Sequence, residues 1–398
     1  MTGRDYLKIW YRVQIAATLV ILFMMMIRNF ELGRNIWLRL LWMVIILAIG
    51  LGIELTPHLP PIVCRVNAWL QAIAQSVILT FAWGVITREM IVLLHMPSRG
   101  VVSLMILFYF VMYAPFASVI GGQLHADWER FLFVLWMFWN VIYPYFNLPL
   151  DLINNPKLSA LLTTGAVGAM GYFILITTVM RAWHLSWPGL KPHFSGDFNW
   201  WILLLLVVLF FVAALAPLFS GFKLPNHQRV FELTCTAFES GVGEETLFRF
   251  ALMGVLFDAL HNVQQRLPIA LVTSAVLFGL MHLSNILLAG QSVPLTIYQA
   301  LNATLVGLFL AVTYVYTGQL WLVMLMHFTS DWISFVTSNS SKIVGTLTSV
   351  DWLSLLLIAV VIIVLTIWMM FGQRRNVMER HVDRLTGKHQ HFGFSIQY

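Results

Sequence analysis

Residues 352–371 read WLSLLLIAVVIIVLTIWMMF, a run without a charged side chain. A helix needs about 20 mostly apolar residues to cross the hydrocarbon core of a bilayer. This run is long and apolar enough to span a membrane, and it guides the interpretation of the rest of the chain.

Comparable apolar runs recur along the whole chain, which has 398 residues, of which 60% are hydrophobic and 10% are charged. A soluble domain carries about 25% charged residues. We therefore expect an all-α polytopic membrane protein with about twelve transmembrane helices. This composition excludes nucleic-acid binding as the main function, and it also excludes a large soluble catalytic domain. The predicted spans are residues 11–27, 36–55, 67–87, 101–120, 131–147, 158–180, 199–219, 230–257, 267–288, 295–316, 320–337 and 352–371.

Basic residues mark both ends of the chain, and positive charge resists translocation across a membrane. We therefore expect cytoplasmic N- and C-termini. We also expect a multi-pass protein of a bacterial plasma membrane. The longest connection, 181–198, separates two predicted regions of six spans each, and we see no repeat between them. Residues 1–198 form an N-terminal region without an assigned role, 199–371 form a second membrane-embedded region, and 372–398 form a basic tail.

The second region places ionisable residues inside predicted spans. A charge at mid-bilayer costs about 2.5–3.5 kcal/mol, so four such groups would cost about 10–14 kcal/mol. Charged groups persist there only when they face one another or a hydrated cavity. They therefore predict a functional site with its charged core at Glu244, Glu245, Arg249 and Asp331, together with His282 and His327. Glu239 also lies within a predicted span.

Spacing divides these residues into three motifs. Glu245 and Arg249 are four residues apart and share a helix face, which favours an ion pair, whereas Glu244 is turned by about 100° and stays free for chemistry. Phe278 and His282 also share a face. On a third span, Asp331 lies one turn after His327 and can orient the imidazole or help to hold a cation. A structural salt bridge and a hydrogen-bonded core histidine are the alternatives.

Glu-Glu-x-x-x-Arg, Phe-x-x-x-His and His-x-x-x-Asp, in this order, resemble the CPBP family over residues 230–335. That family comprises CAAX prenyl endopeptidases and bacteriocin-processing or abortive-infection (Abi) membrane proteins. The resemblance implies an α-helical intramembrane endopeptidase that opens towards the cytoplasm.

By the same resemblance, Glu244 would be the general base that activates water, assisted by His282, and Arg249 would position Glu245. His327 and Asp331 would stabilise the oxyanion or help to hold a metal. Two departures from the family pattern are Asp331, where the prenyl-protease branch favours Asn, and Phe250, where Gly is frequent after the arginine.

The charges of the motif residues bear on the cofactor. With neutral imidazoles, the three carboxylates and the guanidinium sum to −2, which a proton or a bound cation must offset. Zinc is a candidate, with ligands drawn from Glu244, His282, His327 and Asp331, and a metal-free glutamate base is the alternative. We favour zinc slightly, although the HExxH signature is missing from the sequence.

The leading interpretation is hydrolysis of a peptide bond in a membrane-associated, lipidated or apolar peptide or protein. Membrane lipid and this substrate are then the expected partners, and nucleic acid is not. One alternative is a non-catalytic bacteriocin-immunity or scaffold protein of the same family. Another is a proton- or ion-coupled transporter, since acid and histidine pairs in membranes also relay protons.

Overall fold

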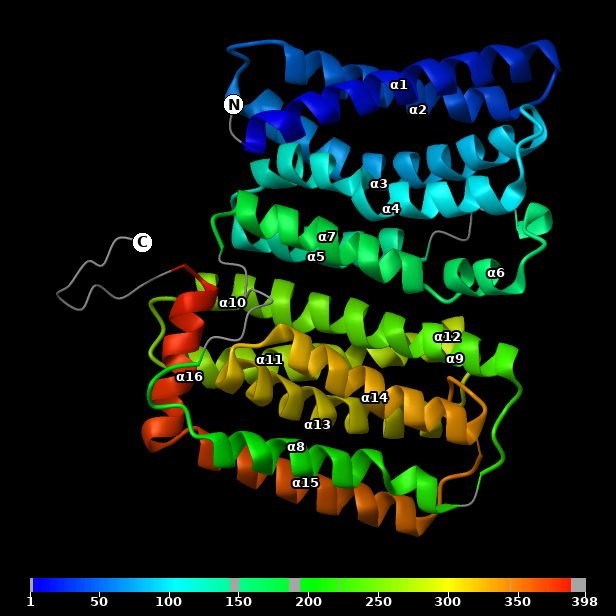
Figure 1. Ribbon diagram of the computed structural model, residues 1–398. Helices are drawn as coiled ribbons and strands as arrows, with labels where there is room; N and C mark the ends of the chain where they lie inside the picture. The colour runs from blue at the N-terminus through cyan, green and yellow to red at the C-terminus, as the bar shows by residue number, and fades with distance from the viewer. Residues whose placement is uncertain (1–2, 144–149, 186–193, 221, 344, 388–398) are drawn as a thin grey trace. The chain divides into compact units, whose positions relative to one another are not determined.

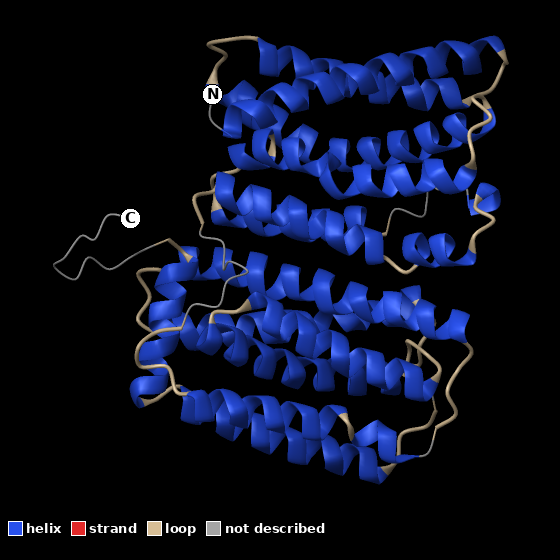
Figure 2. Cartoon of the chain, in the orientation of Figure 1, coloured by secondary structure: helices blue, strands red, loops and turns tan. Residues whose placement is uncertain are grey.

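The computed structural model describes residues 3–143, 150–185, 194–220, 222–343 and 345–387. These residues form helices and connections, with no strand among them (Figure 2). The predicted all-α fold is confirmed. The chain divides into two compact units, Met1–Trp183 and His184–Tyr398, which are described separately.

The N-terminal unit contains seven α-helices in the part that the structure describes (Figure 1). α4 packs against α1 and α7, and α3 packs against α2, α4 and α5. The helices are α1 (Gly3–Glu31), α2 (Ile36–Leu55), α3 (Pro61–Val92), α4 (Ser98–Val119), α5 (Asp127–Ile142), α6 (Pro156–Thr163) and α7 (Ala166–Ala182), with short 3₁₀ turns η1 (Gly121–Gln123) and η3 (Leu150–Leu152).

The second unit also consists of helices and connections in its described residues. α11 packs along α13, and α14 packs against α9 and η5. The elements are α8 (Trp200–Ala214), η4 (Ala216–Ser220), α9 (His227–Glu239), η5 (Ser240–Glu244), η6 (Thr246–Leu252), α10 (Met253–Ala259), α11 (Arg266–Met281), η7 (His282–Ser284), α12 (Asn285–Leu288), α13 (Val293–Thr317), α14 (Leu320–Ser338), α15 (Ser349–Met369) and α16 (Gly372–Leu385).

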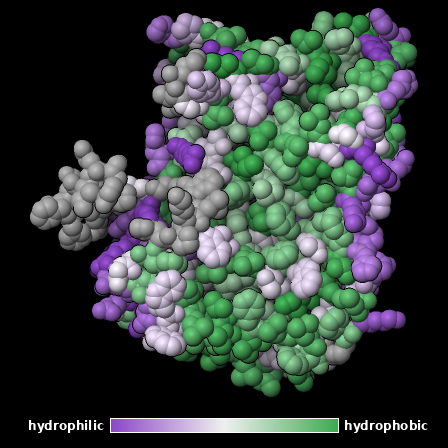
Figure 3. All heavy atoms as spheres, viewed as in Figure 1, coloured by the Kyte–Doolittle hydropathy of each residue, from purple (hydrophilic) through white to green (hydrophobic). Residues whose placement is uncertain are grey.

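Nine helical stretches of the described residues are long and apolar enough to cross a membrane, and the bent pair α6 and α7 could add a tenth. On the face seen in Figure 3, hydrophobic residues cover the middle parts of the helices and hydrophilic residues gather near their ends. The nine stretches are Asp5–Glu31, Ile36–Leu55, Pro61–Val92, Ser98–Gln123, Trp200–Phe219, Arg266–Leu288, Val293–Thr317, Leu320–Ser338 and Ser349–Met369.

The predicted number of twelve spans is not confirmed. The run 131–147 meets only the 16-residue helix α5, and its last residues lie outside the described part. The run 230–257, which carries polar residues of the predicted site, is divided among α9, two π-helical stretches and α10. Parts of the predicted connection 181–198 and of the basic tail, residues 186–193 and 388–398, also lie outside the described residues.

Polar contacts fix the start of α5. The carboxylate of Glu129 is 2% exposed and accepts hydrogen bonds from the backbone N–H groups of His125 and Ala126. Arg65 of α3 approaches it at 2.6 Å, and the indole of Trp69 donates at 3.3 Å. Burial of the carboxyl raises its pKa, but the Ala126 N–H, Arg65, Trp69 and the His125 N–H together hold the pKa of Glu129 below its usual value.

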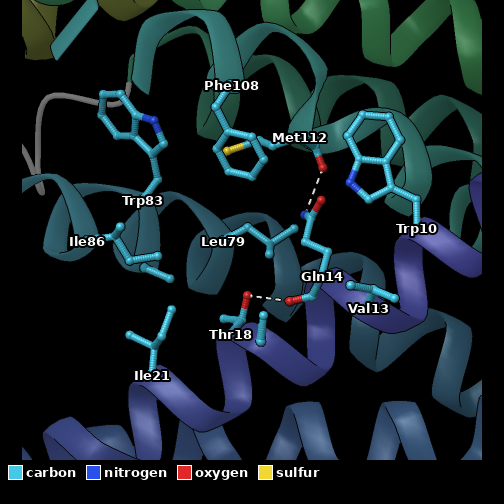
Figure 4. A pocket seen from close by; sticks show the side chains of 12 residues that line it. Trp10, Val13, Gln14, Thr18, Ile21, Leu79, Trp83, Ile86, Phe108 and Met112 are labelled. Atoms are coloured by element: carbon cyan, nitrogen blue, oxygen red, sulfur yellow. Dashed lines mark hydrogen bonds between the residues drawn. The ribbon is translucent and has the colours of Figure 1, made fainter. Parts of the chain in front are cut away.

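A cavity of about 240 Å³ lies between α1, α3 and α4 of the N-terminal unit (Figure 4). Polar groups at its wall bond within the protein: Gln14 donates its amide to the carbonyl of Met112, and Thr18 donates its hydroxyl to the carbonyl of Gln14. The cavity is lined by Trp10, Val13, Gln14, Ala17, Thr18, Ile21, Leu79, Ala82, Trp83, Ile86, Phe108 and Met112, none of which belongs to the predicted site.

The C-terminal helix α16 is tied to the bundle of the second unit. Arg266, the first residue of α11, pairs with Glu379 at 2.8 Å and with Asp383 at 2.7 Å. The guanidinium of Arg384 donates to the carbonyl of Gly318, which ends α13 in the left-handed conformation with φ +64°. These contacts hold the ends of α11 and α13 together and support the helices that carry the predicted site.

Candidate active site

The two glutamates lie on a widened stretch of helix. The carboxamide of Asn226 caps α9 by accepting the N–H of Arg229. The chain then passes through the π-helices η5 and η6, with Glu245 between them. π-helical turns are rare and occur frequently at functional sites. The polar residues Glu244, Glu245 and Arg249 of the run 230–257 therefore lie on π-helical turns or between them.

Close packing on α14 brings this stretch to the histidine of the third motif. A Cβ atom at Gly241 would lie 2.8 Å from Cβ of Phe328 and 2.9 Å from the carbonyl oxygen of Met324. A side chain at position 241 would therefore push η5 away from α14. Because glycine has no side chain, η5 packs closely on α14. Glu244 and Glu245 therefore lie beside His327, the residue before Phe328.

Glu245 is the centre of the buried part of the site. Its side chain is 0% exposed, and its Oε2 lies 3.1 Å from Nε of Arg249, so the predicted pair is confirmed. Its Oε1 lies 2.7 Å from Nδ1 of His327, a contact that the sequence did not predict. A carboxylate can only accept, so Nδ1 carries the proton in this bond. Nε2 of His327 therefore faces the rest of the site.

Arg249 is held from three sides and is 0% exposed. Besides Glu245, it donates from Nη2 to the carbonyl of Gly307 at 3.1 Å. Its guanidinium carbon lies 4.6 Å from the ring centre of Phe278. A Cβ atom at Gly307 would come within 2.8 Å of the Phe278 ring, so the small residue lets α13 approach. The arginine thus offsets a carboxylate charge where water does not reach.

The second glutamate lies at the more accessible side. Oε2 of Glu244 is 3.8 Å from Nε2 of His327, and Oδ2 of Asp331 is 3.5 Å from the same nitrogen. The side chain of Glu244 is 14% exposed and that of Asp331 is 25% exposed, against 0% for Glu245. The site therefore grades from a sealed ion pair to a carboxylate that a water molecule can approach.

His282 lies at the point where α11 ends and the 3₁₀ turn η7 begins. Its Nδ1 lies 2.9 Å from the carbonyl oxygen of Phe278, which fixes the proton on Nδ1 and leaves Nε2 able to accept one. The Phe278 ring lies 5.1 Å from the His282 ring and 5.8 Å from the His327 ring. His282, His327, Asp331 and Glu245 all lie near Glu244.

The six predicted residues therefore come from three separate parts of the chain: the α9–α10 stretch, the end of α11 and α14. The sequence missed the Glu245–His327 hydrogen bond, the carbonyl of Gly307 and the central position of the Phe278 ring. The Gly307 carbonyl could not have been found, because every residue has one. Glu239, also placed in a predicted span, ends α9 and is 4% exposed.

Among the described residues, no group of three or more His, Cys, Asp or Glu side chains is arranged to hold a metal ion. The suggested ligand set of Glu244, His282, His327 and Asp331 therefore stays a prediction. Glu245 occupies Nδ1 of His327 and the Phe278 carbonyl occupies Nδ1 of His282, and partners of this kind also orient histidines that ligate a metal through the other nitrogen. Each imidazole keeps only Nε2 for another partner.

Comparison with known families agrees with this geometry. Residues 226–333 match the family model described as type II CAAX prenyl endopeptidase Rce1-like. The match runs from the cap of α9 through most of α14 and includes all six site residues. No curated protein and no solved structure matched the chain significantly. Rce1-like proteins are a protease family, and the match over this segment, about a quarter of the chain, supports membership of the CPBP family.

Proposed function

We propose that the protein is an intramembrane endopeptidase that hydrolyses a peptide bond in a membrane-associated, lipidated or apolar substrate. The observation that carries the proposal is the position of Glu244. It lies 3.8 Å from the imidazole of His327, which is oriented through its other nitrogen by the sealed Glu245–Arg249 pair. A reactive carboxylate beside an oriented imidazole is an arrangement suited to general acid–base catalysis.

In the proposed reaction, Glu244 accepts a proton from water while the water oxygen bonds to the peptide carbonyl carbon. Nε2 of His282 assists by accepting a hydrogen bond from the same water. The tetrahedral intermediate collapses when the C–N bond breaks, and Glu244 returns the proton to the leaving nitrogen. Water is thus divided between the new carboxyl group and the new amine, and the glutamate is regenerated.

His327 is the proposed oxyanion donor. When it carries a second proton, its Nε2–H can donate to the oxyanion, while Nδ1–H stays on Glu245. That proton also reduces the site's charge from −2 to −1. The carboxylate of Asp331 lies 3.5 Å from Nε2 and can hold the orientation of the imidazole.

A bound zinc ion, instead of a second proton on His327, is the other way of offsetting the negative charge. Metal analysis decides between these two alternatives. If Glu244 acts without a metal, protein freed of metal by chelation and dialysis keeps its activity. About one zinc per chain in the purified protein, lost in Asp331→Asn together with activity, would assign the ion to this site instead.

The proposal is tested by comparing the small peptides and membrane proteins of cells that carry wild-type protein or Glu244→Gln. Substrates should accumulate uncleaved in the variant at equal protein level. Glu232→Gln is a matched control, because Glu232 lies on the same helical stretch and pairs with Arg229 away from the site. Identical peptide patterns in wild type and Glu244→Gln would contradict the proposal.

The other interpretations predict different results. A scaffold or bacteriocin-immunity protein keeps its phenotype in Glu244→Gln, and a proton-coupled transporter gives Glu244-dependent flux in liposomes. We also propose a location in a bacterial plasma membrane. Both termini are proposed to be cytoplasmic, which the basic residues at both ends of the chain support. Whether a Cys-a-a-X sequence is cleaved is answered by the substrates that accumulate.

A further inference from the structure

His282 is carried by a segment with little regular structure of its own. α11 ends at Met281, and the chain continues through the three residues of η7, the four residues of α12 and Gly290 at φ +63° before α13 begins. Helices this short are not stable by themselves, because nucleation costs more than so few hydrogen bonds return. The position of residues 282–292 must therefore come from contacts with neighbouring elements.

One oxygen atom on α13 supplies two of these contacts. Oε1 of Gln299 accepts the side-chain amide of Asn285 at 3.0 Å and the side-chain amide of Gln291 at 3.0 Å. The backbone N–H of Gln291 also donates to the carbonyl of Asn285 at 3.1 Å, which closes the loop between them. Gln299 thus holds both ends of the loop that begins three residues after His282.

Support from elsewhere is exposed to solvent: Nζ of Lys342 donates to the carbonyl of Ala289 at 3.2 Å. Leu287 is 88% exposed and Leu288 is 71% exposed, so neither side chain packs well against the protein. On the inner side, a Cβ atom at Gly279 would overlap the hydroxyl of Thr304, which keeps the end of α11 close to α13. The packing holds the helix up to Gly279, and the Gln299 hydrogen bonds hold the chain after His282.

We infer that Gln299 is a positioning residue for His282, an inference that rests on the proposed hydrolysis. Gln299 does not bond to any of the six site residues in the described structure. It acts by fixing the helix break, which holds the imidazole of His282 toward the water that Glu244 activates. A displacement of about 1 Å at a reacting group can lower a rate by about a hundredfold.

Gln299→Met removes the acceptor oxygen at similar side-chain length, and Gln299→Glu keeps an acceptor at the same place. Tyr298→Phe is the matched control, because it deletes a polar atom on the same turn, where the ring packs on Trp352. Two quantities are measured in full-length protein: hydrogen exchange of the amides of residues 283–291, and kcat and KM for a substrate found with Glu244→Gln.

We expect Gln299→Met to speed exchange in residues 283–291 by about tenfold. We expect kcat to fall by about ten- to a hundredfold with a smaller change in KM. Gln299→Glu should restore most of both values, and Tyr298→Phe should change neither. A merely structural role would lower the amount of folded enzyme and leave kcat per folded molecule unchanged.

Unchanged exchange in Gln299→Met would overturn the anchoring, and faster exchange with unchanged kcat would overturn the positioning role. A wild-type protein without hydrolytic activity would instead contradict the proposed function. The exchange measurement would then still decide whether Gln299 holds the segment.

Discussion

Adjacent glutamates with the same substitution should behave in opposite ways when stability is measured. Glu244→Gln and Glu245→Gln each replace a carboxylate by an amide of nearly equal size. Glu245 is fully buried and holds both Arg249 and His327, whereas Glu244 is partly exposed and its nearest ionic partner is 3.8 Å away. We expect both variants to lose hydrolysis, and only Glu245→Gln to lose stability.

The magnitude follows from the buried pair. Removing one partner of a buried ion pair costs about 3–5 kcal/mol, because the other charge stays behind without compensation. Here the charge left behind is Arg249, whose remaining partner is the neutral carbonyl of Gly307. Glu244→Gln instead reduces the excess negative charge of the site. We expect its free energy of unfolding to stay within about 1 kcal/mol of wild type, on the stabilising side.

Thermal unfolding in one detergent at pH 7 measures the contrast. About 2–4 °C per kcal/mol is typical for domains of 150–250 residues, so Glu245→Gln should lower Tm by about 6–20 °C. Glu244→Gln should change Tm by less than about 4 °C. Arg249→Met should resemble Glu245→Gln, because it breaks the same pair from the other side.

An equal decrease of Tm in both glutamine variants would refute the different roles of the two glutamates, since Glu244 would then be a structural residue. A Glu245→Gln protein with wild-type Tm would refute the buried pair itself. Hydrolysis by Glu244→Gln at a normal rate would refute the assignment of the base and leave the stability argument intact.

Three further outcomes are expected. Gly241→Val should push η5 away from α14 and destabilise the second unit by about 1–3 kcal/mol, measured by thermal unfolding, whereas Gly52→Val, where a Cβ atom meets open space, tests the general effect of the substitution. The folded-state pKa of Glu129 is lowered, so its stabilising contribution is present above the unfolded-state pKa and is lost as pH falls through the folded-state pKa. Glu129→Gln should therefore flatten the acid side of the plot of Tm against pH; an unchanged acid side would contradict this reasoning. Arg266→Met should release α16, seen as faster hydrogen exchange in residues 372–385, and unchanged exchange would show that other contacts suffice.

The sequence determined the class of fold because the cost of placing charge in hydrocarbon is local and large. A run such as 352–371 can be recognised without knowledge of its neighbours. The number of spans did not follow from the sequence, because a run that carries polar residues is harder to assign to one helix. The run 230–257 contains the polar residues of the site, and its helix is divided into α and π stretches that length and hydropathy do not foresee.

The contacts of the site that could be predicted from the sequence are those between residues on the same helix. Residues four apart share a face, so the Glu245–Arg249 pair and the proximity of Asp331 to His327 follow from the sequence. Contacts between helices depend on rotation and separation, which local spacing does not specify. The structure alone decided that Glu245 binds His327, and that Gly307 supplies a carbonyl to Arg249.

The sequence by itself thus determined that costly polar residues must meet inside a helical membrane protein, and which residues they are. The tertiary structure decided which partner each one takes. The physical reason is that burial penalties belong to single residues, whereas the hydrogen bonds that offset them need atoms from different helices within about 3 Å. That distance is set by close packing at positions such as Gly241, where a side chain would keep the helices apart.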